Sequence, residues 1–227
     1  MGLSVQRVRI WDLPTRLFHA ALLLLLVLTE FTAQIGADWM LWHLRLGSLL
    51  GVLLLFRLVW GGVGGRWSRF SHFDVTPRKL LAYVRGRTQS RWPGHNPLGA
   101  LSVLTLLLLL AVQVGSGMLA DDEVAYAGPW ALQVSTEVSQ WATAWHAHAG
   151  HGLLLGFIAL HIAAVLFHQF LKGDDLIGPM RHGDRVWAKT AEGVEPSRDD
   201  MRSRVLALII VGGCAGVWLF GLGGWPG

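Results

Sequence analysis

The chain has 227 residues, of which 52% are hydrophobic and only 15% are charged, and its mean hydropathy is +0.44. Because soluble domains usually carry about 25% charged residues, this composition argues against a soluble protein and indicates one that lies in lipid. The net charge of +4 does not indicate nucleic-acid binding, since the basic residues lie between apolar runs, where topology and anionic lipid explain them.

Five runs are long and apolar enough to cross a bilayer, because about 20 helical residues span about 30 Å of hydrocarbon. In chain order they are Leu17–Ile35, Trp39–Trp60, a run within Trp92–Ala120, a run within Val138–Leu171, and Val205–Trp225. The sequence therefore predicts an all-α integral membrane protein. We expect a four-helix transmembrane bundle in residues 1–183, a cytoplasmic linker in 184–204 and an additional transmembrane helix in 205–227.

The fifth run contains no histidine and is rich in glycine at positions 212, 213, 216 and 221. Small residues suit close helix packing in membranes. We therefore expect a structural or partner-binding role for this helix.

Positive charge is distributed unevenly between the two sides of a membrane that the chain is predicted to cross five times. Of 19 Lys and Arg residues, 18 fall on one side, and only Arg45 lies near the other. The opposite segments carry the acidic residues Glu30, Asp38, Asp121, Asp122, Glu123 and Glu137. By the positive-inside rule, we expect the N-terminus to be cytoplasmic and the C-terminus to lie on the opposite side of the membrane. The first run is not expected to be a cleaved signal peptide.

Histidines are unusually frequent in the predicted spans. Ionisable groups at membrane depth are costly and usually functional. Neutral imidazole is also the usual axial ligand of b-type haem, which needs two imidazoles from facing helices at similar depth. Seven of the ten histidines lie in or at the edge of a span: His19, His43, His146, His148, His151, His161 and His168.

The predicted direction of each span gives these histidines approximate depths in the membrane. His19 begins the first span on the inner side, and His43 begins the second on the outer side. His161 lies 15 residues after His146, or about 22 Å further in at 1.5 Å per residue. These depths predict a haem-binding bundle with an inner haem iron on His19 and His161 and an outer one on His43 and a histidine of the fourth span.

The outer ligand on the fourth span can be His146 or His148. At 100° per residue, His146 lies about 60° from the face of His161, whereas His148 lies about 140° away. This favours His146, with His148 as the alternative. The cluster of His146, His148 and His151 could instead bind a transition metal, although no further ligand on that span completes such a site.

The remaining polar residues have simpler interpretations. Arg45 and Arg57 could hold haem propionates or could snorkel to the membrane surface. His168 is expected at the inner headgroup level, and His72, His95 and His182 in loops. Cys214 is the single cysteine, so neither a disulfide nor a C-x-x-C-H haem attachment is expected. No catalytic side chains are predicted, because no Ser–His–Asp set or carboxylate pair stands out.

Several segments resemble the bacterial cytochrome b561 family, especially its branch shared with the cytochrome b subunits of nickel-iron hydrogenases. They are RIWDLPTRLFH at 9–19, LWHLRLG around His43, LLFRLVWG at 54–61, GHNPLGAL at 94–101 and LHIAAVLFH at 160–168. The similarity covers roughly residues 5–183. It implies a four-helix core with two b haems and, by direct motif match, His19, His43 and His161 as ligands.

The fourth ligand departs from the family pattern in spacing. The family has a Trp-His or Leu-His pair 14 residues before the last ligand. Trp145 and His146 match this pair in type, but His146 stands 15 residues before His161. The resemblance therefore implies one inserted residue, and His148 remains the alternative.

The resemblance also implies a multi-pass protein of the bacterial inner membrane, with its C-terminus in the periplasm, and a function in a respiratory chain. Family members exchange electrons between membrane quinone and a periplasmic redox partner, such as a c-type cytochrome, dehydrogenase or hydrogenase. One alternative is a superoxide-to-quinone oxidoreductase, but the acidic outer segments would repel that anion. Alternatives of another class are a haem-free transporter with a histidine proton relay, or a membrane anchor for a soluble redox enzyme.

Overall fold

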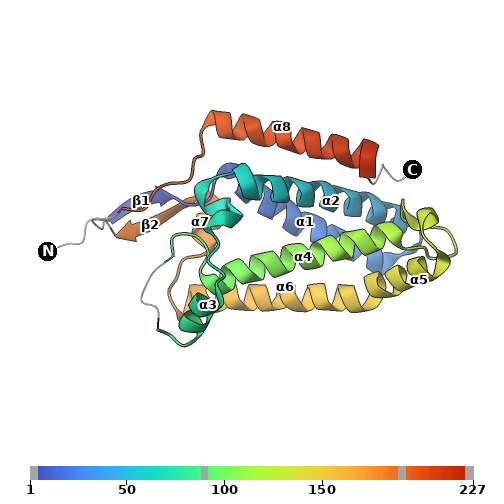
Figure 1. Ribbon diagram of the computed structural model, residues 1–227, viewed down its shortest axis with the longest axis horizontal. Coiled ribbons are helices and arrows are strands. Elements are labelled where there is room, and N and C mark those ends of the chain that lie inside the picture. Colours follow the sequence, from blue (N-terminus) through green and yellow to red (C-terminus); the bar gives the residue numbers. More distant parts are fainter. Residues whose placement is uncertain (1–4, 88–91, 189–192, 223–227) are drawn as a thin grey trace. The chain divides into compact units, whose positions relative to one another are not determined.

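The computed structural model describes residues 5–87, 92–188 and 193–222 (Figure 1). Within this part of the chain, five helices are long and apolar enough to span a membrane. Their segments are α1 (Leu13–Ile35), a 3-10 turn and α2 (Ala37–Trp39 and Met40–Val63), α4 (Pro97–Leu119), α5 to α6 (Thr136–Ala144 and His151–Leu166) and α8 (Met201–Val217). The prediction of an all-α membrane protein with five spans is thus confirmed. The end of the fifth predicted span, 223–225, lies outside the described residues.

Three π-helical turns interrupt or extend these spans. One joins α5 to α6 over Trp145–Gly150, one follows α6 over Phe167–Leu171, and one follows α8 over Trp218–Leu222. A π-turn holds one residue more than an α-helical turn and is frequent at functional sites. The first π-turn contains His146 and His148, so it accommodates an extra residue where the sequence spacing implied an insertion.

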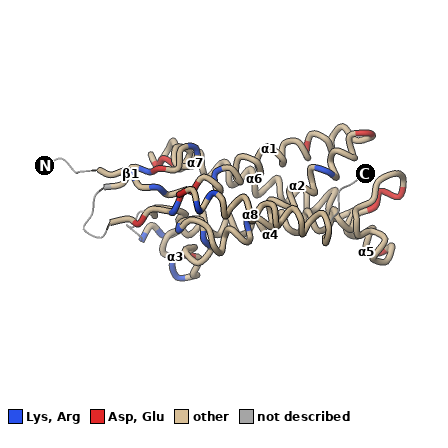
Figure 2. The backbone as a smooth tube through the Cα atoms, turned by 90° about the horizontal axis from the view of Figure 1, so that it is seen from above, with Lys and Arg blue, Asp and Glu red and all other residues tan. Residues whose placement is uncertain are grey.

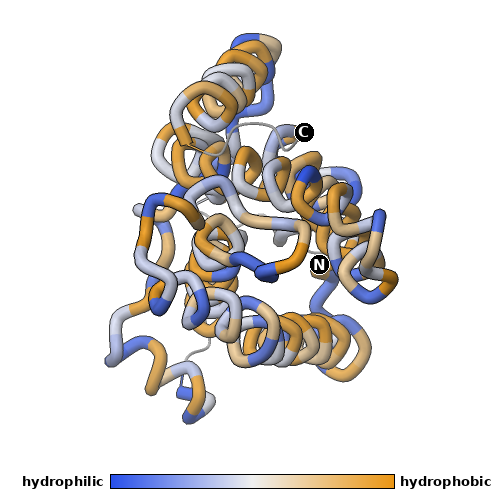
Figure 3. The backbone as a smooth tube through the Cα atoms, turned by 90° about the vertical axis from the view of Figure 1, so that its right-hand side faces the viewer, coloured by the Kyte–Doolittle hydropathy of each residue, from blue (hydrophilic) through white to orange (hydrophobic). Residues whose placement is uncertain are grey.

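The long helices expose apolar side chains, as expected of surfaces that contact lipid. Leu24 on α1 is 59% exposed, Leu108 on α4 is 64% exposed and Leu208 on α8 is 72% exposed. Figure 3, which views the long helices nearly end-on, shows many hydrophobic residues (orange) in them. In water such exposure would be unfavourable, so the helices need a lipid environment.

The chain divides into two compact units, to both of which all five long helices contribute. The basic unit comprises Met1–Leu17, Leu58–Leu104 and Leu160–Leu208, and the acidic unit comprises Phe18–Arg57, Thr105–Ala159 and Ile209–Gly227. The basic unit holds 17 of the 19 Lys and Arg residues, whereas the acidic unit holds two of them with six carboxylates. In Figure 2 charged residues are sparse along the long helices.

A small antiparallel sheet in the basic unit was not foreseen from the sequence. Strand β1 (Val5–Arg9) pairs with β2 (Asp184–Ala188), so that part of the segment expected to be a linker is a strand. Two short helices, α3 (Pro77–Val84) and α7 (Ile177–His182), lie in the same unit. Its core is formed by Val8, Ile10 and Trp11, against which Trp67, Met180, Trp187 and Val194 pack.

Asp12 fixes the start of α1 in the basic unit. Its fully buried carboxylate accepts hydrogen bonds from Thr15 N–H at 2.8 Å, Trp60 Nε1 at 3.1 Å, Gly65 N–H at 3.0 Å and Ser68 Oγ at 2.9 Å. The bond to Thr15 satisfies an otherwise unpaired amide of the first helical turn. This capping explains why α1 begins at Leu13, four residues before the predicted start of the span.

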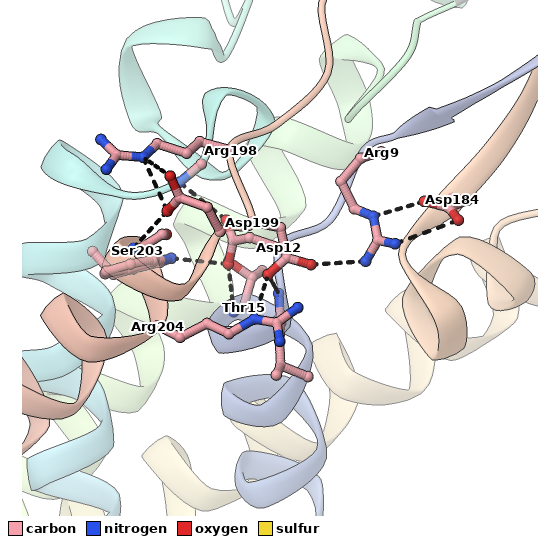
Figure 4. Close-up of polar contacts among 12 residues, drawn as sticks. Arg9, Asp12, Thr15, Asp184, Arg198, Asp199, Ser203 and Arg204 are labelled. Carbon is pink, nitrogen blue, oxygen red and sulfur yellow. Dashed lines mark hydrogen bonds and ion pairs between the residues drawn. The ribbon is translucent and has the colours of Figure 1, made fainter.

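A second carboxylate, Asp199, connects three elements of the basic unit (Figure 4). It pairs with Arg9 of β1 at 2.7 Å, accepts the N–H of Leu13 at 3.1 Å and pairs with Arg204 of α8 at 3.3 Å. Arg9 also pairs with Asp184 of β2 at 2.7 Å. The first strand, the first span and the fifth span are therefore joined by one ionic network.

In the acidic unit, the end of the fifth span packs against α2 through Trp218. The ring of Trp218 lies where a Cβ of Gly51 would be, so this contact requires glycine on α2. By contrast, a Cβ at Gly212, Gly213 or Gly216 would meet no atom within 4 Å. Packing among the described residues therefore does not account for these small residues of α8.

Candidate functional site

The structure brings His43 and His146 together within the acidic unit. His43 lies in the first turn of α2, and His146 lies in the π-turn between α5 and α6. Their ring centroids are 6.0 Å apart and the ring planes are nearly perpendicular, at 84°. The sequence predicted that these two residues form the outer haem pair, and their role as ligands stays a prediction.

Backbone carbonyls hold both rings of this pair in the same tautomer. Nδ1 of His43 lies 3.0 Å from the carbonyl oxygen of Thr29 on α1, and Nδ1 of His146 lies 2.8 Å from that of Gln113 on α4. Because a carbonyl oxygen only accepts, each Nδ1 must carry the proton and donate it. Nε2 of each ring therefore keeps its lone pair, as a metal-ligating imidazole requires.

The residues around His146 fix the position of its ring. The side-chain amide of Gln113 donates to the backbone carbonyl of His146 at 2.8 Å. A Cβ at Gly117 of α4 would lie only 2.7 Å from Cε1 of His146, so the ring rests directly on the backbone of α4. Sequence reasoning missed Thr29 and Gln113, although a lone glutamine in the apolar run of α4 was a usable signal.

The dimensions of the His43–His146 pair fit a haem iron. With metal–imidazole bonds of about 2 Å, two Nε2 ligands on opposite sides of one metal set their ring centroids about 6 Å apart. The observed separation is 6.0 Å. The centroid distance is therefore compatible with ligation of one metal through Nε2 of both rings.

The predicted inner ligands His19 and His161 lie in different units. His161 is a half-buried residue of α6 in the basic unit, and its Nδ1 lies 3.3 Å from the hydroxyl of Ser102. His19 is an exposed residue of α1 and belongs to the acidic unit. Their pairing stays a prediction.

The other histidines of the fourth span have different surroundings from His146. His148 is exposed, and His151 bonds through Nε2 to the carboxylate of Glu30 at 2.8 Å. His168 uses both nitrogens, since Nδ1 lies 3.0 Å from Asp174 and Nε2 lies 3.4 Å from the hydroxyl of Tyr83. These contacts agree with the interpretation of His168 as a residue outside the haem sites.

A site for a transition metal on the cluster His146, His148 and His151 gains no support from the structure. Within residues 5–87, 92–188 and 193–222, no group of three or more His, Cys, Asp or Glu side chains could hold a metal ion. The engagement of His151 with Glu30 removes one of the three nitrogens that such a site would use.

The two arginines considered for propionates differ in environment. Arg45 lies over the ring of Trp42, with its guanidinium carbon 5.3 Å from the centroid, which is a typical interfacial arrangement. Arg57 is only 3% exposed, so it does not snorkel to the surface. Arg57 is therefore the stronger candidate for a buried anionic partner.

Outside the spans, electrostatics shape the segment that joins α4 to α5. The carboxylate of Asp122 accepts the backbone N–H groups of Tyr126, Ala125 and Val124, and these bonds lower its pKa below the ordinary aspartate value. Asp122 therefore stays ionised at neutral pH and adds to the negative charge of the acidic unit.

Membrane helices that hold paired imidazoles with free Nε2 atoms define a class of protein, the haem-binding membrane cytochromes. Comparison with known proteins agrees with this class. The model of the prokaryotic cytochrome b561 family matches residues 10–183, about three quarters of the chain. The chain therefore belongs to the prokaryotic cytochrome b561 family.

Three relatives are each described as a probable Ni/Fe-hydrogenase B-type cytochrome subunit. The one from Bradyrhizobium diazoefficiens is 27% identical over 63% of this chain and 64% of that protein. Those from Cupriavidus necator and Rhizobium leguminosarum bv. viciae are 21% and 24% identical, over 82% and 80% of this chain and 90% of each relative. The chain thus spans just under two thirds of the length of the first. No solved structure matches the chain.

Membership of this family implies a multi-pass membrane protein that carries b-type haem and transfers electrons. The recognition made from the five sequence segments is confirmed, including its relation to hydrogenase cytochromes.

Proposed function

We propose that the chain is a di-haem cytochrome that carries electrons between membrane quinone and a periplasmic redox partner. The outer haem is held by His43 and His146, and the inner haem by His19 and His161. The observation that carries the proposal is the His43–His146 pair, with centroids 6.0 Å apart and both Nδ1 protons donated to carbonyls.

The chain's own residues position the cofactor and need perform no bond-making chemistry. Haem supplies one-electron oxidation and reduction when it is bound. His43 and His146 offer their Nε2 atoms, while the carbonyls of Thr29 and Gln113 hold the rings in place and raise their basicity as ligands. Arg57, buried on α2, is a candidate to neutralise a propionate.

The proposed orientation places the Lys- and Arg-rich segments outside the spans in the cytoplasm, and the acidic segments at residues 36–38 and 120–137 at the periplasmic side of the inner membrane. It is supported by the excess of Lys and Arg in the basic unit. The redox partner would then dock at the periplasmic side. A hydrogenase is our first candidate because the relatives are described as hydrogenase cytochrome subunits, and a basic c-type cytochrome is the second.

A reduced-minus-oxidised difference spectrum of the purified protein tests the haem assignment. It should show a b-type α-band, and the pyridine haemochrome should give two haems per chain. A protein without the band would be a transporter or an anchor, and a single haem would end the two-site proposal. Rapid quinone reduction by superoxide alone would contradict the role proposed for a protein partner.

A further inference from the structure

An ionisable pair within the acidic unit takes no part in the His43–His146 site. Glu30 of α1 and His151 of α6 are joined by Oε2 and Nε2 at 2.8 Å. Gln34, one turn along α1, donates from Nε2 to the other carboxylate oxygen at 2.9 Å. Both partners lie in membrane-spanning helices, where ionisable groups are costly and usually functional.

The pair is accessible from the side of the helices. The side chains of Glu30 and His151 are 36% and 33% exposed. On the same helices Val27, Phe31 and Leu155 are exposed apolar residues. Glu30 and His151 thus form a small polar site on an otherwise apolar surface.

This surface selects for a particular kind of ligand. A ligand that reaches it must be soluble in lipid, and it must also present polar atoms to a carboxylate and an imidazole. A phospholipid phosphate would be repelled by Glu30, whereas a quinone presents two carbonyl oxygens that accept hydrogen bonds and its quinol presents two hydroxyls that also donate them. Quinone is therefore the lipid-soluble redox compound that fits this chemistry.

The pair is coupled along the chain to the proposed outer haem ligands. Glu30 directly follows Thr29, whose carbonyl oxygen accepts the Nδ1 proton of His43. His151 directly follows the π-turn that contains His146. A ligand at the pair would therefore lie beside the elements that hold the outer pair.

We propose that Glu30 and His151 bind the head of a membrane quinone and exchange its protons, which deepens the proposed function and rests on it. Reduction of one quinone to quinol takes up two electrons from the cytochrome and two protons. In the free protein Nε2 of His151 shares its proton with Glu30, and when quinone is bound and reduced this proton passes to one quinone oxygen. The other oxygen takes its proton from the aqueous phase, which also reprotonates the pair, and quinol oxidation is the reverse.

The test is quinone binding by the purified haem-loaded protein, with decyl-ubiquinone and menadione as probes. Glu30→Gln and His151→Asn should each raise the Kd of the better probe about tenfold, because each removes a charge-assisted hydrogen bond. The α-band and the haem content should stay unchanged. The control Glu137→Gln makes the same change at an exposed residue of α5 and should leave the Kd unchanged.

A second measurement uses the unmutated protein. Its infrared difference spectrum on quinone reduction should contain a carboxyl band that shifts when glutamate is labelled with carbon-13 and that is absent in Glu30→Gln. If neither probe binds the haem-loaded protein, or if both variants bind it as tightly as the control, the pair is a structural ion pair and the inference is wrong. A wild-type protein without haem would instead refute the proposed function.

Discussion

Substitution of Gly117 by alanine tests whether the ring of His146 must stand where the structure places it. The added Cβ would lie 2.7 Å from Cε1 and 3.0 Å from Nδ1 of that ring. Carbon atoms prefer separations of about 3.5–4.0 Å, so the ring must retreat by about 1 Å. The 2.8 Å bond from Nδ1 to the Gln113 carbonyl would then exceed the usual range of about 2.7–3.2 Å.

Loss of this hydrogen bond should weaken the outer haem site selectively. Removal of such supporting contacts typically lowers metal affinity by about 10–100-fold. We therefore expect Gly117→Ala to lose about one haem per chain when the purified protein is challenged with apomyoglobin. The pyridine haemochrome measures the haem that remains.

Gly115→Ala is the matched control, because it makes the same change on the same helix where a Cβ would meet no atom within 4 Å. Equal retention of both haems by Gly117→Ala and Gly115→Ala would refute the placement of His146 as a ligand. Loss of haem from both variants would show that α4 tolerates no added methyl group, and His146→Ala would then decide the assignment.

Three further predictions address the ligands, the basic unit and the acidic segment. His43→Ala should remove one of the two haems, whereas His148→Ala should keep both, and the pyridine haemochrome measures the haem content of each variant. Retention of two haems by His43→Ala would exclude His43 as a ligand. Asp12→Asn should lower the free energy of unfolding in detergent by about 1–3 kcal/mol, because a buried amide NH2 would face N–H donors. The control Asp74→Asn removes a surface ion pair and should lower the free energy of unfolding by at most about 1 kcal/mol. Because the folded-state pKa of Asp122 is lowered, its stabilisation of residues 122–126 is complete above the unfolded-state pKa and is lost as pH falls through the folded-state pKa. Amide exchange at Val124 should therefore accelerate at acid pH in the wild type, relative to neighbouring amides, and Asp122→Ala should abolish that dependence.

Hydropathy and charge were sufficient to predict the five spans, because lipid imposes the same length and apolarity on each. The proximity of His43 to His146 could also be predicted, because helical rise gives the depth of each residue along its span. Their role as haem ligands stays a prediction. The hydrogen bonds to their Nδ1 atoms could not be predicted, because the acceptors are backbone carbonyls, those of Thr29 and Gln113. Only the lone glutamine in the apolar run of α4 marked one of these two positions. The spacing anomaly at His146 did carry information, and the π-turn is its structural counterpart.

The sheet escaped prediction for a different reason. Strand β1 has five residues, and its partner β2 follows about 175 positions later, so no local pattern connects them. The role of Asp12 was equally hidden, because a carboxylate before a proline-containing helix start looks like any surface cap. Its complete burial depends on Trp60 and Ser68, which only the folded chain brings to it.

The network around Asp199 has a consequence for the order in which the protein is made. Arg9 leaves the ribosome early, but its partners Asp184 and Asp199 are synthesised only after the fourth span. Ser197, whose hydroxyl donates to the Ile10 carbonyl at 2.6 Å, arrives equally late. Strand β1 therefore has no pairing partner until the first four spans and strand β2 have been synthesised. Closure of the basic unit thus requires the chain as far as Asp199, and a protease that cleaves exposed N-terminal segments would distinguish molecules in which this segment has been made from those in which it has not.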